Sequence, residues 1–212
     1  MHSILLLHGD PHAAGRLADI VRSTSGLQLA GRAHSLAQAR TMIEQRTPDL
    51  VLATLRLEDG WATRLMDEIR GPGRKGGPLL VVLADSFSDP NLMLGLRHGA
   101  DGYVVQGRAK EAIVSALRLV LGGGAPMSPE IACQVLAHFE APGDASAAYN
   151  NVATLQLTPD ERLMLDHVSA GYLPHEIARQ LRLSEAQVTV RVRNVYRKLQ
   201  YDLRGSLQLI DA

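Results

Sequence analysis

The sequence predicts a two-domain α/β protein, with an N-terminal doubly wound domain on a five-stranded parallel sheet and a small all-α domain after it. Two features of the chain support this fold class. In residues 1–122, five short apolar runs alternate with stretches of helical spacing, which is typical of a parallel sheet with helices on both faces. From residue 157 onward, three helices with clear start signals follow one another.

The expected strands are apolar at nearly every position, as in LLVVL, which is typical of strands covered on both faces. They comprise residues 4–7, 27–33, 50–55, 79–84 and 102–105. Between and after them, apolar residues recur at intervals of three and four, which indicates helices. These helices are expected at 13–23, 36–45, 62–70, 91–98 and 108–121.

The two domains are joined by a helix and a polar segment. Three glycines at 122–124 end the fifth helix, because residues without a side chain lose the most entropy in a helix. Ser128 and Pro129 then begin another helix, which runs to about Phe139. Residues 141–156 show no periodicity and predict a flexible linker. The expected domains are therefore 1–122 and 157–212, with a linker helix and flexible linker at 123–156.

The second domain has the pattern of a helix-turn-helix. Thr158 and Glu161 predict a capping box at the start of its first helix, which ends at Gly171. Pro174 starts a second helix, and Ser184 caps a third. Two short helices joined by a tight turn, the second carrying basic residues, are typical of this DNA-binding motif.

The third helix of this domain carries the candidate DNA contacts. Its apolar stripe at 188, 192, 195 and 199 is expected to face the core. Residues 184–200 hold four basic side chains and one acidic one, a charge of +3 that suits phosphates. Arg191 and Arg193 are expected to contact bases or phosphates, and Arg197 and Lys198 the DNA backbone. The full predicted set is Thr189, Val190, Arg191, Arg193, Asn194, Arg197 and Lys198. The alternative is a solvated basic face, which is the usual role of a charge run.

Composition limits the remaining classes. Lys plus Arg total 22 and Asp plus Glu total 22, which alone would favour a neutral enzyme or interaction protein. Since residues 157–212 hold eight basic and seven acidic residues, the charge that attracts DNA is confined to the third helix. The single cysteine, Cys133, fits a reducing compartment. No apolar run is long enough for a membrane helix, and we expect a cytoplasmic protein.

The stretch LTPDERLMLDHVSAGYLPHEIARQLRLSEAQVTVRVRNVYRKL resembles the DNA-binding domain of LuxR-type, or NarL/FixJ-type, bacterial transcription regulators. The resemblance implies that this domain binds double-stranded DNA. Two positions depart from the family pattern, since Thr189 stands where Lys is usual and Arg191 where His is usual. The resemblance therefore supports the fold more firmly than any operator sequence.

The N-terminal domain resembles the receiver domain of response regulators. PDLVLATL matches the third receiver strand, GADGYVVQ the fifth, and SPEIACQVLAHF the linker helix. The resemblance implies a sheet of order 2-1-3-4-5 and a pocket beyond the carboxyl ends of strands one and three. It also covers nearly the whole chain, in the NarL/FixJ layout.

The receiver positions that capture phosphate are all replaced in this chain. His8 and Gly9 stand for the acidic pair that binds Mg²⁺, Thr54 for the phosphoacceptor Asp, Ala84 for the hydroxyl residue and Gln106 for the Lys. Thr54 cannot form an acyl phosphate. We therefore expect a pseudo-receiver without aspartyl phosphorylation, metal or cofactor. The predicted degenerate pocket comprises His8, Gly9, Asp10, Thr54, Ala84 and Gln106.

An alternative is that another carboxylate substitutes for the missing acceptor. Asp10, Asp49 and Asp59 are the candidates, although Asp49 stands at the start of the third strand and Asp59 lies in the following turn. Tyr103 matches the aromatic switch position, but Ala84 removes the hydroxyl residue with which it would couple.

The sequence thus predicts a transcription regulator, not an enzyme, that binds a two-half-site operator as a homodimer. By the resemblance, dimerisation would involve the fourth and fifth helices or the adjacent sheet edge. A ligand or partner protein at the altered pocket could control it. A competing hypothesis is a protein-interaction adaptor that sequesters another regulator.

Overall fold

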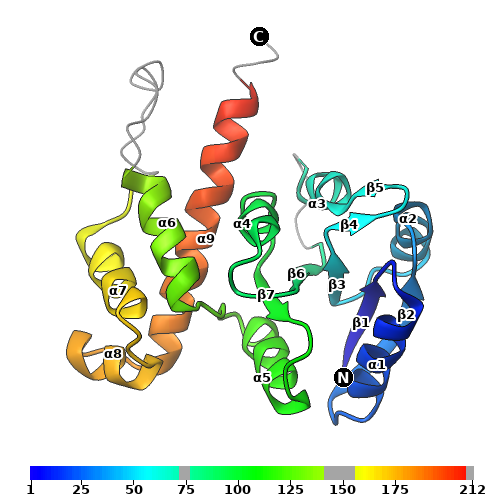
Figure 1. Cartoon of the computed structure of the whole chain (residues 1–212), viewed down its shortest axis with the longest axis horizontal. Coiled ribbons are helices and arrows are strands. Elements are labelled where there is room, and N and C mark those ends of the chain that lie inside the picture. The colour runs from blue at the N-terminus through cyan, green and yellow to red at the C-terminus, as the bar shows by residue number, and fades with distance from the viewer. Residues whose placement is uncertain (72–76, 141–155, 209–212) are drawn as a thin grey trace. The chain divides into compact units, whose positions relative to one another are not determined.

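The computed structural model describes residues 1–71, 77–140 and 156–208, with side chains described as far as Tyr201. The chain divides into two compact units between Gly122 and Gly123 (Figure 1). The flexible linker expected at 141–156 lies outside the described residues except for Gln156.

The N-terminal unit contains a five-stranded parallel sheet. Its strands are β1 (His2–Leu7), β2 (Leu27–Ala33), β3 (Leu50–Thr54), β6 (Leu79–Ala84) and β7 (Gly102–Val105). They lie in the order β2-β1-β3-β6-β7, and each neighbouring pair is parallel. The predicted fold class and strand order are confirmed.

Five helices cover this sheet: α1 (Pro11–Arg22), α2 (Leu36–Gln45), α3 (Ala62–Arg70), α4 (Pro90–Arg97) and α5 (Lys110–Leu121). Helix α1 packs near α5 on one face, and α2 packs near α3 on the other (Figure 1). The central strands are buried over most of their length, with Ile4, Leu6 and Leu52 at 0 % exposure. Continuous apolar strands between two helical layers explain why the strand pattern does not alternate.

A short antiparallel hairpin follows β3, where the sequence predicts only a turn. Strands β4 (Arg56–Leu57) and β5 (Gly60–Trp61) pair with each other. Gly60 has a φ of +135°, which favours glycine. Asp59 in the same hairpin accepts hydrogen bonds from the backbone N–H groups of Leu36 (3.0 Å) and Ala37 (3.2 Å) at the start of α2. Hydrogen bonds therefore connect the hairpin to the first turn of α2.

The C-terminal unit is helical, with α6 (Pro129–Glu140), α7 (Pro159–Ser169), α8 (Pro174–Leu181) and α9 (Glu185–Gln208). The predicted capping box of Thr158 and Glu161 is confirmed. Ser184 and Gln187 make the equivalent reciprocal bonds before α9. The predicted apolar stripe of α9 is confirmed as well, since Val188, Val192, Val195 and Leu199 are buried.

Helix α6, expected as a linker helix, is packed into the C-terminal unit. It lies against α7, and Ile131, Ala132 and Val135 are fully buried. Ser128 is buried and accepts a hydrogen bond from the Ile131 N–H group at 3.4 Å. Of the helices in the described ranges, none has the length and apolar character needed to cross a membrane.

Candidate nucleic-acid interface and receiver-like pocket

The carboxyl ends of the parallel strands surround a cavity of about 230 Å³. Five of the six residues predicted for the degenerate pocket line it, namely His8, Gly9, Asp10, Thr54 and Gln106. The sixth, Ala84, does not line it; its side chain is 1 % exposed and its carbonyl accepts a hydrogen bond from the Gln106 N–H group. Sequence reasoning missed the polar residues that complete the lining: Arg56, Asp85, Asp89 and Asn91.

A chain of hydrogen bonds crosses this pocket. The backbone N–H of Asp10 donates to Nδ1 of His8 at 3.0 Å. Because a backbone N–H can only donate, Nδ1 accepts, and the ring proton of the neutral imidazole lies on Nε2. Nε2 of His8 then donates to Oε1 of Gln106 at 2.9 Å, and Nε2 of Gln106 lies 3.4 Å from Oδ1 of Asp85. His8 and Gln106, which the sequence predicts at an acidic and a lysine position of a receiver, are therefore bonded to each other.

Two of the three carboxylates that line the pocket, those of Asp10 and Asp89, serve as helix caps. Oδ1 of Asp10 accepts a hydrogen bond from the His12 N–H at the start of α1 at 2.8 Å, and this bond holds the pKa of Asp10 below its ordinary value. Asp89 accepts a hydrogen bond from the Asn91 N–H at the start of α4 at 2.9 Å. Within residues 1–71, 77–140 and 156–208, no group of three or more His, Cys, Asp and Glu side chains could hold a metal ion.

The other two alternative acceptors lie away from the cavity lining. Asp49 precedes β3, at its amino end, and accepts hydrogen bonds from the Ser3 N–H (2.7 Å) and hydroxyl (2.8 Å), which lower its pKa. Asp59 binds the start of α2, and the Leu36 N–H group is the main cause of its lowered pKa. Thr54 is the residue at the carboxyl end of β3, where its hydroxyl lies 3.4 Å from the Leu7 carbonyl oxygen.

Tyr103 in β7, which the sequence matches to the aromatic switch position, is buried within its unit. It is 4 % exposed and packs edge-on against Phe87, with ring centroids 6.1 Å apart. The guanidinium of Arg108 lies over the Phe87 ring at 5.7 Å. The Tyr103 ring is thus packed against Phe87. Position 84, where the resemblance places a hydroxyl residue, is an alanine in this chain.

Helix α9 presents three of the seven predicted DNA contacts outward. Val190, Asn194 and Arg197 are exposed, at positions four and three residues apart that share one face. Val190 borders a shallow hollow that is also lined by Ala186, Gln187 and Arg191. Ala186 and Gln187 were not in the predicted set; their place in the first turn of α9 is the signal that could have found them, because base contacts come from the start of a recognition helix.

Ion pairs connect two of the predicted contacts to α7. Nη1 of Arg191 lies 3.2 Å from Oδ2 of Asp160, and the arginine side chain is 32 % exposed. Nζ of Lys198 donates to Oε2 of Glu161 at 2.6 Å and to the carbonyl of Gln156 at 2.9 Å. The Lys198 side chain is 19 % exposed, so its predicted contact with the DNA backbone would compete with the ion pair to Glu161.

Thr189 and Arg193 are half-buried at the other edge of α9, beside residues 123–126. The Thr189 carbonyl accepts a hydrogen bond from the Ala125 N–H at 3.2 Å. A Cβ placed on Gly123 would lie 3.6 Å from Nη1 of Arg193. The seven predicted DNA contacts therefore fall into two groups. Val190, Asn194 and Arg197 are exposed, and the other four are half-buried on either side of them.

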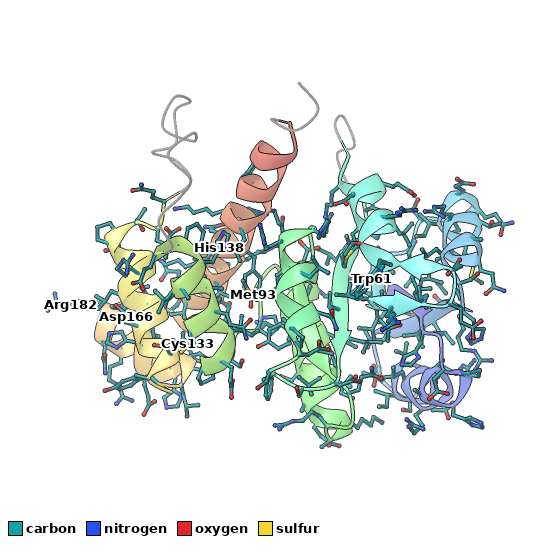
Figure 2. The ribbon with its side chains drawn as sticks, turned by 45° about the horizontal axis from the view of Figure 1, so that its top comes forward. Trp61, Met93, Cys133, His138, Asp166 and Arg182 are labelled. Carbon is teal, nitrogen blue, oxygen red and sulfur yellow. The ribbon has the colours of Figure 1, made fainter. Side chains whose placement is uncertain are left out.

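Basic side chains outside α9 add to the exposed surface of this unit. Arg179 on α8 and Arg182 in the turn before α9 are both exposed, and Figure 2 shows Arg182 projecting from that turn. Arg182 has a φ of 54°, in the left-handed region. Sequence reasoning confined to the third helix missed both residues, although the first helix of this motif crosses the DNA backbone.

Comparisons with known proteins agree with both units. Residues 155–209 match the model of bacterial regulatory proteins, luxR family. The chain is 27 % identical over 202 residues to the nitrate/nitrite response regulator protein NarL of Escherichia coli K12, covering 95 % of this chain and 91 % of that protein. It is 26 % identical to the DNA-binding transcriptional activator DevR/DosR of Mycobacterium tuberculosis, covering 92 % and 88 %.

Two solved structures show the same fold. A LuxR-family two-component response regulator from Aurantimonas sp. SI85-9A1 has a TM-score of 0.57 at 21 % identity, covering 65 % of this chain and 97 % of that one. RcsB from Salmonella enterica serovar Typhimurium, bound to promoter rprA with phosphomimetic BeF3⁻, has a TM-score of 0.52 at 15 % identity, covering 94 % and 92 %.

A receiver-like α/β domain followed by a helix-turn-helix unit is the architecture that this chain shares with response regulators. Its C-terminal domain is of the luxR family. Over nearly its whole length the chain is similar to DNA-binding transcription regulators of the NarL type.

Proposed function

We propose that this chain is a cytoplasmic, sequence-specific regulator that works without aspartyl phosphorylation and binds a two-half-site operator as a homodimer. The observation that carries the proposal is the pocket at the strand ends. Where a receiver needs acidic groups, an acceptor and a lysine, a hydrogen-bonded chain from His8 through Gln106 to Asp85 occupies the site.

The chemistry of the pocket supports phosphorylation independence. Mg²⁺ prefers several oxygen ligands in octahedral array, whereas the carboxylates of Asp10 and Asp89 are used by the first turns of α1 and α4. A phosphoryl group on Thr54 would face Gln106 in place of a lysine cation. The aspartates that could substitute are held at helix starts or at the opposite end of β3.

Acetyl phosphate with Mg²⁺ tests this part of the proposal. The full chain and a Thr54→Asp variant are incubated with both reagents, and intact mass and DNA affinity are measured. We expect neither protein to gain a phosphoryl group, because the variant restores the acceptor without the acidic pair or the lysine. A phosphoryl adduct on an aspartate of the wild-type chain that also changes DNA affinity would overturn the proposal.

The expected DNA contacts are the outward residues of α9, with Arg191 at its edge. Arg191 borders the hollow beside Val190 and is held near the helix surface by Asp160. Arg197 is exposed and near the middle of the helix. We therefore propose a base contact for Arg191 and a phosphate contact for Arg197.

Alanine variants distinguish the two roles. Arg191→Ala should cost about 1 to 3 kcal/mol of binding free energy and relax the preference at one base pair. Arg197→Ala should weaken all sequences alike and reduce the slope of log affinity against log salt by about one. Equal affinities of Arg191→Ala and wild type for selected and scrambled sites would contradict the assignment.

Dimeric binding follows from the single recognition helix of each chain. One helix-turn-helix reads one half-site, and a two-fold dimer places two of them on a pseudo-palindrome. A relative structure contains two RcsB dimers bound to two parallel DNAs, and its TM-score to this chain is 0.55 at 14 % identity. Sedimentation with duplexes of one and two half-sites tests the stoichiometry; one chain per two-half-site duplex would rule it out.

A second candidate is control by a small polar ligand. The cavity of about 230 Å³ combines Arg56, Asn91 and Gln106 with the carboxylates of Asp85 and Asp89. A few convergent polar groups in a concave site are typical of ligand recognition. Thermal shift screening with wild type and Gln106→Leu tests it, since a ligand of this pocket should stabilise only the wild type.

A further inference from the structure

The chain that leaves the N-terminal unit is attached to the recognition helix. Helix α5 ends at Leu121, and the next residues, 123–126, lie against α9 within the C-terminal unit. The Ala125 N–H donates to the Thr189 carbonyl at 3.2 Å, and the Tyr196 hydroxyl donates to the Pro126 carbonyl at 2.6 Å. Thr189 and Tyr196 are seven residues apart, so these two bonds join the 123–126 segment to α9 about two helical turns apart.

Both attachment points are buried. Ala125 is 1 % exposed and Tyr196 is fully buried. A buried hydroxyl and a buried N–H group each require a partner, because an unsatisfied polar group costs free energy inside a protein. The contact is therefore a built part of the unit and not a surface touch.

The 123–126 segment occupies the edge of α9 that carries two predicted DNA contacts. Thr189, Arg193 and Tyr196 recur at intervals of four and three, so they share one face of the helix. Thr189 and Arg193 are half-buried there, and the Arg193 guanidinium lies next to Gly123. In this arrangement the segment lies along the edge of the helix that carries these side chains and leaves them half-buried.

Contacts with α7 and with the 123–126 segment leave few cations of α9 available to DNA. Arg191 and Lys198 are ion-paired with Asp160 and Glu161 of α7. With Arg193 beside the segment, Arg197 is the one cation among the described side chains of α9 that is exposed and has no carboxylate partner. Since each phosphate neutralised by a cation adds to affinity, the attached state should bind DNA weakly.

We propose that the 123–126 segment is a regulatory contact: attached to α9, it keeps Arg193 and Thr189 from DNA, and its release raises DNA affinity. Gly122, the last residue of the N-terminal unit, immediately precedes the segment. A change in that unit can therefore act on the recognition helix through three residues of chain. The inference rests on the proposed DNA-binding function and adds how that function is regulated.

Tyr196→Phe tests the contact with a matched control. The variant removes the hydroxyl that bonds Pro126 and keeps the ring, whereas Tyr201→Phe makes the same change at an exposed tyrosine of the same helix. Loss of one hydrogen bond should increase the released population, so the full chain should bind DNA about two- to ten-fold more tightly. The salt slope should steepen by about one, and Tyr201→Phe should match wild type.

The assay uses fluorescence anisotropy with duplexes that the wild-type chain selects from a random pool. Hydrogen exchange of the Ala125 amide, with and without that DNA, measures release directly in the unmodified protein. We expect this amide to lose protection when DNA binds. Protection that is retained in the complex would overturn the inference, even if Tyr196→Phe fails to fold.

Failure of the inference and failure of the function give different results. If no duplex is enriched and none is bound by any variant, DNA binding itself fails. If duplexes are bound but Tyr196→Phe and wild type have equal affinity and salt slope, only the regulatory role of the segment fails.

Discussion

Lys198 allows two roles to be distinguished. The sequence predicts that it contacts a DNA phosphate, whereas the structure shows it ion-paired with Glu161, where it would stabilise the C-terminal unit. Its ammonium donates to Glu161, which is 8 % exposed, and to the Gln156 carbonyl. Lys198→Met keeps a straight side chain but leaves the Glu161 carboxylate without its cation. Hydrogen bonds to charged groups contribute about 1.5 to 3 kcal/mol, so the C-terminal unit should lose stability of this size.

The loss should be local to one unit. For a domain of this size, about 2 kcal/mol corresponds to a decrease in Tm on the order of 10 °C. Hydrogen exchange of α7 and α9 measures it, while the fluorescence of Trp61, the single tryptophan of the chain, reports the N-terminal unit. Arg197→Met is the matched control, since Arg197 is exposed and has no carboxylate partner among the described residues.

In a DNA-binding assay we expect Arg197→Met to have the larger effect and Lys198→Met the smaller one, the reverse of their effects on stability. Arg197→Met should reduce the salt slope by about one phosphate contact, whereas folded Lys198→Met should keep the wild-type slope. An unchanged stability of α7 in Lys198→Met, together with a reduced salt slope, would refute the structural role and restore the predicted backbone contact.

Further predictions concern packing and pH. Gly95→Ala should destabilise the N-terminal unit by about 1 to 3 kcal/mol, because a Cβ there would lie 2.5 Å from a methyl group of Val82. Gly15→Ala in α1 meets nothing within 4 Å and should stabilise it by about 0.5 to 1 kcal/mol, so equal melting curves would contradict this contrast. Hydrogen bonds from Ser3 lower the pKa of Asp49 from its ordinary 3.8. The ionised Asp49 carboxylate should therefore stabilise the fold above pH 3.8, and this stabilisation should be lost as the pH falls through the lowered pKa of Asp49. The free energies of unfolding of Asp49→Asn and wild type, measured by urea titration, should converge at low pH.

Much of the secondary structure could be predicted because its causes are local. The helices at 36–45 and 62–70 were predicted with the bounds that the structure shows. The capping boxes before α7 and α9 depend on residues three positions apart. The hairpin of β4 and β5 was missed, since two-residue strands are too short to show an alternating pattern.

The candidate sites were predicted in part. The pocket gathered five of six expected residues because the strand ends of a parallel sheet meet at one edge. On α9 the periodicity correctly identified the buried stripe but could not show which cations remain available. The basic residues at its edges have partners in α7 and in residues 123–126, which helical spacing within α9 does not reveal.

By itself the sequence determined the fold class and the likeness of the C-terminal domain to the luxR family, because strand composition, caps and motif spacing involve residues close together in the chain. Only the tertiary structure decided the partners of the charged and polar side chains. Lys198 and Glu161 are 37 residues apart, and Tyr196 and Pro126 are 70 apart. Such pairs meet only once the chain has folded, and they determine which polar side chains of α9 are exposed.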